Sequence, residues 1–263
     1  MPRAFWKGVI SFGMVAIPIK MYKATETKEI SFHMLHNKCM ARANQVLYCP
    51  TDNEYIDRKD TVRGYEFTKG RYVVLTDEDF EKIPLKTAHA INILRFVEEK
   101  EIDPTYYYGS HYLEPEELGA KPFRLLRESL QKSGLVGIAK VVLQRREHLC
   151  CVRPLGEIMA LDTVHYQKEI VPAEQISPPK AEITEPELEM AMNLIKVMAG
   201  HFQPELYKDE YQSALKELVE AKIKGEKIVA PEGPKIEIGD LMASLRASIA
   251  AAKKEPVLAG AKK

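Results

Sequence analysis

The sequence has few cysteines, no long apolar run and no excess of either charge. Its 263 residues include four cysteines, two of them adjacent at Cys150 and Cys151, which is too few for a disulfide framework and fits a reducing compartment. No apolar stretch reaches the roughly 20 residues of a membrane-spanning helix. Near the N-terminus, Lys7 and neighbouring glycines interrupt any apolar core of a signal peptide. We therefore expect a soluble cytoplasmic protein.

Motifs of the common enzyme classes are missing as well. The sequence has no glycine-rich phosphate loop, dinucleotide fingerprint, zinc-protease helix or serine elbow, and we expect a protein that is not an enzyme. The alternative is a metal-dependent hydrolase that uses Asp77, Asp79 and Glu81 as paired carboxylates. Carboxylates also gather in the first turn of a helix, where they favour the helix dipole.

Four residues could hold zinc. His33, His36, Cys39 and Cys49 have the spacing H-x2-H-x2-C-x9-C, but the segment lacks the paired C-x2-C knuckle of a typical zinc site. In the other interpretation, residues 30–35 form a strand whose core face carries Phe32 and Met34, which leaves His33 on the opposite face. We expect no metal and no cofactor, with His36, Cys39 and Cys49 as weak candidates.

The charges balance overall, at 38 basic and 38 acidic residues, but they are unevenly spread. Residues 1–45 carry seven basic and two acidic side chains, and residues 118–153 carry eight and two. Residues 77–117 have four basic and eleven acidic side chains. Such segregation fits a surface that attracts a polyanion and another that repels it, although charge blocks on solvated faces are common.

Basic side chains without acidic neighbours could neutralise phosphates without reading bases. Surface salt bridges are the alternative for part of this set. Its members are Lys7, Lys20, Arg42, Lys121, Arg124, Arg127, Lys140, Arg145, Arg146 and Arg153.

Short segments rich in β-branched and aromatic residues recur up to about residue 170, which predicts a β-barrel or sandwich. The expected strands are 8–13, 15–22, 30–35, 71–76, 90–97, 105–113, 135–144, 148–153 and 157–166. Pro18 makes 15–22 an edge or bulged strand, and Cys150 and Cys151 face opposite sides of theirs. A helix over 121–134 buries Phe123, Leu126 and Leu130, points Arg124 and Arg127 away, and ends at Gly134.

The remainder of the chain predicts helices. Prolines mark 171–186 as an extended connector. Thr184 and Glu187 form a capping-box pattern before a helix with Leu188, Ala191, Ile195 and Met198 along one side. A second helix covers about 207–224. After a linker, Asp240 caps a short helix that must dock or fold on binding a partner, since it is too short to be stable alone.

Several strings of this sequence resemble the bacterial Ku family. They are WKGVISFGMVAIPIKMYKATE (6–26), RGYEFTKGRYVVLTDEDF (63–80), EIDPTYYYGSHYLEP (101–115), KPFRLLRESLQKSGLVGIAKVVLQRREHLCCVRP (121–154), HFQPELYKDEY (201–211) and the DLMASLRASI helix. The resemblance implies an α+β fold, mainly β: a barrel with extended bridge arms and a helical C-terminal arm. It also implies a homodimeric ring that binds double-stranded DNA ends on the nucleoid during non-homologous end joining and recruits an ATP-dependent, multifunctional DNA ligase.

The resemblance also implies a domain layout. Residues 1–170 would be the barrel core with a DNA-embracing bridge at about 121–153, 171–186 the connector, 187–226 the helical arm whose apolar stripes pack across the dimer, and 227–263 a linker, short helix and lysine-containing tail that recruits the ligase. Because 121–153 resembles the bridge, the strongest expected phosphate contacts are Arg124, Arg127, Lys140, Arg145, Arg146 and Arg153. Lys7, Lys20 and Arg42 are weaker expectations.

Overall fold

The computed structural model describes residues 3–83, 89–225 and 240–254. The chain divides into two compact units, Met1–Gln175 and Ile176–Lys263, and this boundary lies within the proline-rich 171–186 segment. In the described part of the chain, no helix has both the length and the apolar character needed to cross a membrane.

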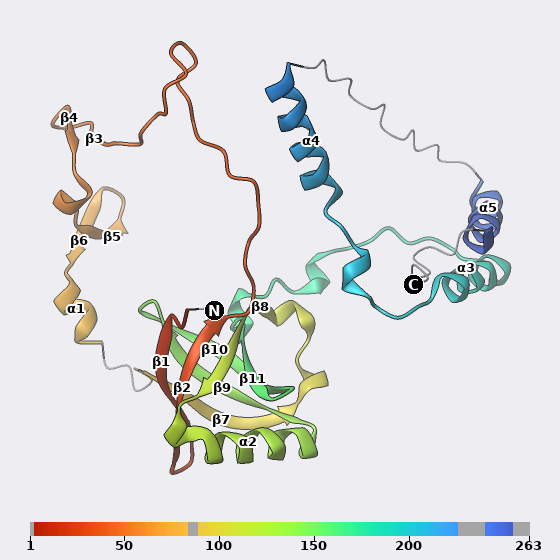
Figure 1. Ribbon diagram of the computed structural model, residues 1–263, viewed down its shortest axis with the longest axis horizontal. Helices are drawn as coiled ribbons and strands as arrows, with labels where there is room; N and C mark the ends of the chain where they lie inside the picture. Colours follow the sequence, from red (N-terminus) through yellow and green to blue (C-terminus); the bar gives the residue numbers. More distant parts are fainter. Residues whose placement is uncertain (1–2, 84–88, 226–239, 255–263) are drawn as a thin grey trace. The chain divides into compact units, whose positions relative to one another are not determined.

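The first unit is built on a closed barrel of seven strands, in the order β1-β2-β8-β11-β10-β9-β7 (Figure 1). Neighbouring strands are antiparallel except β1 and β7, which close the barrel in parallel. The strands are β1 (Trp6–Phe12), β2 (Val15–Lys23), β7 (Ala90–Glu98), β8 (Tyr107–Pro115), β9 (Leu135–Leu143), β10 (Arg146–Leu155) and β11 (Ile158–Val164). The predicted fold class, mainly β with helices, is confirmed.

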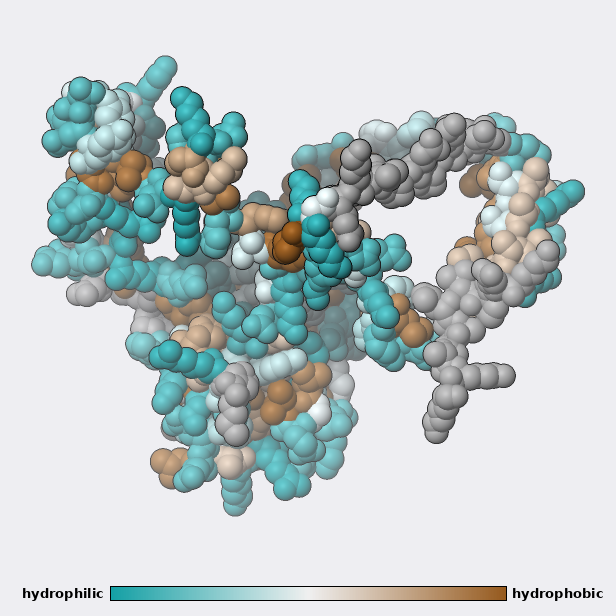
Figure 2. Space-filling model, turned by 45° about the horizontal axis from the view of Figure 1, so that its top comes forward, coloured by the Kyte–Doolittle hydropathy of each residue, from teal (hydrophilic) through white to brown (hydrophobic). Residues whose placement is uncertain are grey.

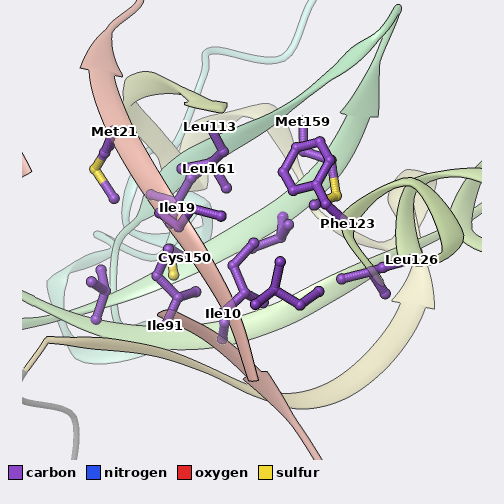
Figure 3. Close-up of a cluster of buried hydrophobic side chains, with 14 of the residues drawn as sticks. Ile10, Ile19, Met21, Ile91, Leu113, Phe123, Leu126, Cys150, Met159 and Leu161 are labelled. Atoms are coloured by element: carbon purple, nitrogen blue, oxygen red, sulfur yellow. The ribbon is translucent and has the colours of Figure 1, made fainter. Parts of the chain in front are cut away.

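The barrel core follows from the two-residue period of its strands. In β2, Ile17, Ile19 and Met21 alternate with more exposed residues and are fully buried. The helix α2 (Ala120–Ser133) directs Phe123 and Leu126 into the same cluster (Figure 3). As predicted, α2 ends at Gly134, which has a φ of 69° and donates its N–H to the carbonyl of Leu130.

The expectation that Pro18 marks an edge or bulged strand is wrong. The strand β2 pairs with β1 on one side and β8 on the other. Pairing with β8 begins at Ile19, opposite Pro115, and the Pro18 carbonyl accepts from the Glu116 N–H just beyond it. The proline lies where that pairing ends, so a barrel strand accommodates it.

The adjacent thiols of β10 do face opposite sides of the strand, and both are buried. Cys150 lies in the barrel core, and Cys151 lies in a second apolar cluster with Val136 and Val164. Partly buried side chains that precede β8, including Tyr106, cover this second cluster. The outer face of the barrel is therefore dry at this point as well.

Residues 25–83, here called the excursion, share no sheet with the barrel. Their regular elements are one hairpin of β3 (Leu47–Cys49) and β4 (Glu54–Ile56), a short 3-10 helix (Arg58–Asp60), a second hairpin of β5 (Arg63–Thr68) and β6 (Arg71–Leu75), and the helix α1 (Asp77–Glu81). No described side chain of the excursion is buried. Apolar residues are visible at the surface in several places (Figure 2).

One prediction for the excursion is wrong. Residues 30–35 form no strand; Leu35 makes only an isolated bridge to Arg42, and Phe32 and Met34 are exposed because nothing packs on them. The predicted bridge elements at 121–153 are α2, β9 and β10, which belong to the barrel and its core. The segment that leaves the barrel is the excursion.

Within its described residues, the second unit has three α-helices, α3 (Glu185–Met198), α4 (Glu210–Lys224) and α5 (Leu241–Lys254). The capping box of Thr184 and Glu187 is confirmed. Asp240 accepts from the Met242 N–H at 3.3 Å, and α5 packs against α3, so the short helix docks. The predicted linker and the end of the lysine-containing tail lie outside the described residues.

Candidate nucleic-acid interface

Three of the nine predicted phosphate contacts form no ion pair within the described residues. Lys7 of β1 lies directly opposite Lys20 of β2, and Arg42 is exposed in the excursion. Within the described residues, none of the three has a carboxylate within ion-pair distance. Lys20 also lies opposite Glu114 of β8, but the Tyr22 hydroxyl donates to that carboxylate at 2.5 Å. Like charges placed opposite each other destabilise a sheet, and an anion would relieve this cost.

Four further predicted cations are at least partly accessible but ion-paired, as the alternative interpretation allowed. Arg124 contacts Glu128 at 2.7 Å and Lys140 contacts Glu147 at 2.8 Å. The other two contacts are Arg145 to Asp77 at 2.6 Å and Arg146 to Glu169 at 2.5 Å. The hydrogen bond from Arg124 holds the pKa of Glu128 below its usual value. The three arginine side chains are at least 60% exposed, and ion pairs this exposed contribute little stability, so a phosphate can compete for them. The Lys140 side chain is 35% exposed.

The last two predicted cations are used inside the protein. Arg127 was expected to point away from the core, but its side chain is 8% exposed; it donates to the Gly156 carbonyl and pairs with Glu157 at 3.1 Å. Arg153 contacts the buried carboxylate of Asp162 at 2.6 Å. Arg127 is itself buried and needs these partners, whereas Arg153 pairs with a carboxylate that burial would otherwise leave unpaired; both are structural uses of the charge.

Sequence reasoning missed other accessible cations. Arg3 and Lys23 lie at adjacent ends of β1 and β2 and line a pocket with Phe5 and Thr25. Arg63 of β5 lies beside Arg145 on the same carboxylate, Asp77. Arg3 and Lys23 belong to the basic block 1–45 and could have been chosen from it. The position of Arg63 depends on contacts between distant segments and has no local signal.

The possible zinc ligands do not come together. The ring nitrogen Nδ1 of His36 lies 3.1 Å from the Cys39 Sγ, whereas Cys49 donates to Asp52 at 3.0 Å. Across the residues that the structure describes, no three His, Cys, Asp or Glu side chains are placed to share a metal ion.

The acidic cluster begins a helix, as one of the two interpretations held. Thr76 caps α1, and Asp79 completes the capping box. Asp77 binds two arginines, and the hydrogen bond from Arg145 lowers its pKa. Both described carboxylates are engaged with their own chain, and the side chain of Glu81 lies outside the described residues. This arrangement does not favour a hydrolase.

The helices of the second unit leave apolar side chains uncovered. On α3, the predicted stripe residues Leu188, Ile195 and Met198 are largely exposed, while Met190, Leu194 and Val197 are half-buried. One face of α3 is thus partly covered and another is open to a partner.

The fold is a closed seven-stranded barrel with cations on its surface that form no ion pair in the described part of the chain. A protein-family model described as "Ku70/Ku80 beta-barrel domain" matches residues 11–190. The chain therefore belongs to the Ku family. Curated relatives named "Non-homologous end joining protein Ku" include those of Symbiobacterium thermophilum, 44% identical over 95% of this chain, and Archaeoglobus fulgidus, 40% identical over 95%. That of Frankia casuarinae is 41% identical over 95%.

The relatives differ in length. The alignment spans 63% of the Symbiobacterium protein, 64% of the Frankia protein and 100% of the Archaeoglobus protein. This chain therefore covers less than two thirds of two relatives and the whole of a third.

Proposed function

We propose that this protein binds the ends of double-stranded DNA, without sequence preference, as a homodimeric ring in non-homologous end joining. It acts at the nucleoid in the cytoplasm and recruits and stimulates an ATP-dependent DNA ligase. The observation that carries the proposal is the family match across residues 11–190, together with relatives whose names place them in end joining.

The proposed DNA contacts are the accessible cations: Lys7, Lys20, Arg42, Arg124, Lys140, Arg145 and Arg146. We leave out Arg127 because its side chain is buried, and Arg153 because it is bound to the buried carboxylate of Asp162. Arginine and lysine reach phosphates in any register, so the grip is independent of sequence.

The exposed apolar side chains of the excursion are an argument for the proposed homodimer. An isolated two-stranded hairpin is at best marginally stable in water, yet Tyr65, Tyr72 and Val74 of the β5–β6 hairpin are each at least half exposed. These side chains need a partner surface, and a ring of two chains would provide one. We assign the DNA-embracing role to residues 25–83 in place of 121–153.

Ring closure is tested by DNA topology. A closed ring loads only from a terminus, so gel shifts should show strong binding to linear duplex and little to covalently closed duplex of equal length. Equal binding to both would contradict the ring.

The logarithm of the apparent binding constant should also fall with the logarithm of the salt concentration, at a slope of about −0.9 per phosphate contacted. No salt dependence would indicate a scaffold that does not bind DNA. Arg145→Ala with Arg146→Ala should flatten that slope by up to about two for every sequence alike.

Ligase recruitment is assigned to the C-terminal region that contains α5. Truncation after Gly239 should leave the dimer and most DNA binding intact and reduce ligation by an added ligase. Since α5 packs on α3, the truncated protein also needs a check of its helix content by circular dichroism. Full ligase stimulation by the truncated dimer would refute the assignment.

A further inference from the structure

Two arginines meet on a single carboxylate oxygen at the end of the excursion. The Arg63 Nη1 lies 3.0 Å from Asp77 Oδ1, and the Arg145 Nη1 lies 2.6 Å from the same atom. The three residues come from β5, the β9–β10 turn and α1, so the fold and not the local sequence brings them together. All three side chains are at least 60% exposed.

Each arginine has a further feature, beyond the carboxylate, that orients it. Arg63 lies over the ring of Phe80 at 5.2 Å from its centroid, a cation–π geometry that orients the group. Arg145 occupies a tight turn in which it and Gln144 have φ values of 65° and 51°. Non-glycine residues seldom adopt this left-handed backbone, so the turn fixes the direction in which Arg145 projects.

Asp77 takes no part in the capping box of the helix on which it lies. The capping box that begins α1 uses Thr76 and Asp79, and the Asp77 side chain is 66% exposed. Its carboxylate therefore fills a positive site, and for α1 it supplies only a first-turn charge that favours the helix dipole. A phosphodiester presents two oxygens of similar charge, and arginine pairs bind such groups with several parallel hydrogen bonds.

We propose that Arg63 and Arg145 form a clamp for a backbone phosphate of DNA, and that Asp77 occupies this clamp as a resident competitor when DNA is absent. DNA displaces the carboxylate, and both arginines transfer to the phosphate. The inference rests on the proposed function, adds Arg63 to the DNA contacts and gives Asp77 an autoinhibitory role.

The test compares two variants with the same change in charge. Asp77→Asn removes the competitor, and Glu78→Gln removes the neighbouring carboxylate, for which no ion pair is present within the described residues. Affinity for a linear duplex, measured by fluorescence anisotropy, should rise about two- to fivefold in Asp77→Asn, which corresponds to the strength of an exposed ion pair. Glu78→Gln should change it distinctly less. Equal gains in the two variants, or weaker binding by Asp77→Asn, would overturn the clamp.

Arg63 is tested by a double-mutant cycle. Arg63→Ala should weaken binding, and it should do so by a larger factor in the Asp77→Asn background, where the whole charge of Arg63 is available to phosphate. Equal factors in both backgrounds would mean that Asp77 does not compete. Circular dichroism and size-exclusion chromatography establish that the variants are folded.

Absence of duplex binding by the wild-type protein would refute the proposed function together with the clamp. Normal wild-type binding, with equal duplex affinities for Asp77→Asn and Glu78→Gln, would refute the clamp alone.

Discussion

The barrel and the excursion both contain strands rich in β-branched and aromatic residues, yet only the barrel buries them. Ile10, Leu113 and Leu161 of the barrel are fully buried, whereas Tyr55 and Val62 of the excursion are 74% and 73% exposed. The barrel closes seven strands and an end-covering helix around one core (Figure 1). The excursion pairs its strands only two at a time, and a hairpin has no interior.

The contrast teaches that strand-forming sequence and self-sufficient folding are separate properties. A barrel strand gains stability from both neighbours and from the core, so the barrel can fold as a unit of its own. A lone hairpin needs a surface to cover one of its faces. The excursion is therefore the part of the first unit whose order depends most on a partner.

Thiol labelling should give the largest difference between the two regions. Cys39 and Cys49 of the excursion are exposed or half-buried, and Cys150 and Cys151 are buried in the barrel. Burial, with a smaller contribution from Asp162, raises the pKa of Cys151 to about 12. With iodoacetamide and mass spectrometry, the barrel thiols should react at least about 1,000-fold more slowly, because they react only from the unfolded state. Similar alkylation rates for all four thiols would contradict the difference in burial between the barrel and the excursion.

The same shift predicts how stability depends on pH. Because the pKa of Cys151 is raised in the folded barrel, the protonated thiol favours folding. This contribution is complete below the ordinary value of 9.0 and is lost as the pH rises toward about 12. Urea midpoints measured at rising alkaline pH should therefore fall, and Cys151→Ala should reduce that fall.

Core substitutions should separate the regions next. Leu161→Ala should destabilise the barrel by about 2–5 kcal/mol through loss of buried area and the cavity left behind. Val74→Ala, in β6, should leave barrel unfolding within about 0.5 kcal/mol of wild type and weaken self-association instead. Trp6, the one tryptophan, packs against the barrel core, so its fluorescence in urea titrations reports the barrel, and sedimentation reports the dimer. A large loss of barrel stability in Val74→Ala would mean that the barrel depends on the excursion for its stability.

Local signals in the sequence predicted much of the barrel. The two-residue alternation of Ile17, Ile19 and Met21 placed β2, and the spacing of Phe123 and Leu126 with Gly134 beyond them placed α2 and its end. The capping box at Thr184 was found in the same way. Each of these signals spans only a few residues, and the contacts in the folded protein favour the same local structure.

The errors concern contacts between distant segments. Closure of the barrel by β1 and β7 places Pro18 in an interior strand. The carbonyl of Gly156 draws Arg127 inward, although helical spacing pointed it outward. Glu169 and Asp77 pair with arginines far from them in the sequence, so the free cations could not be separated from the paired ones by a local count of charges.

The smallest predicted effect concerns a stability cost on the surface of the barrel. Lys7 faces Lys20 across β1 and β2, so Lys7→Ala should stabilise the barrel by a few tenths of a kcal/mol, the scale of a cross-strand pair. It should also weaken DNA binding and reduce the salt slope by about one. Lys132→Ala removes an equal charge from the exposed last turn of α2 and should do neither. If both variants weaken binding equally, only net charge matters. Stabilisation together with weaker binding in Lys7→Ala alone would mean that the barrel, like the excursion, keeps an unfavourable surface that its ligand relieves.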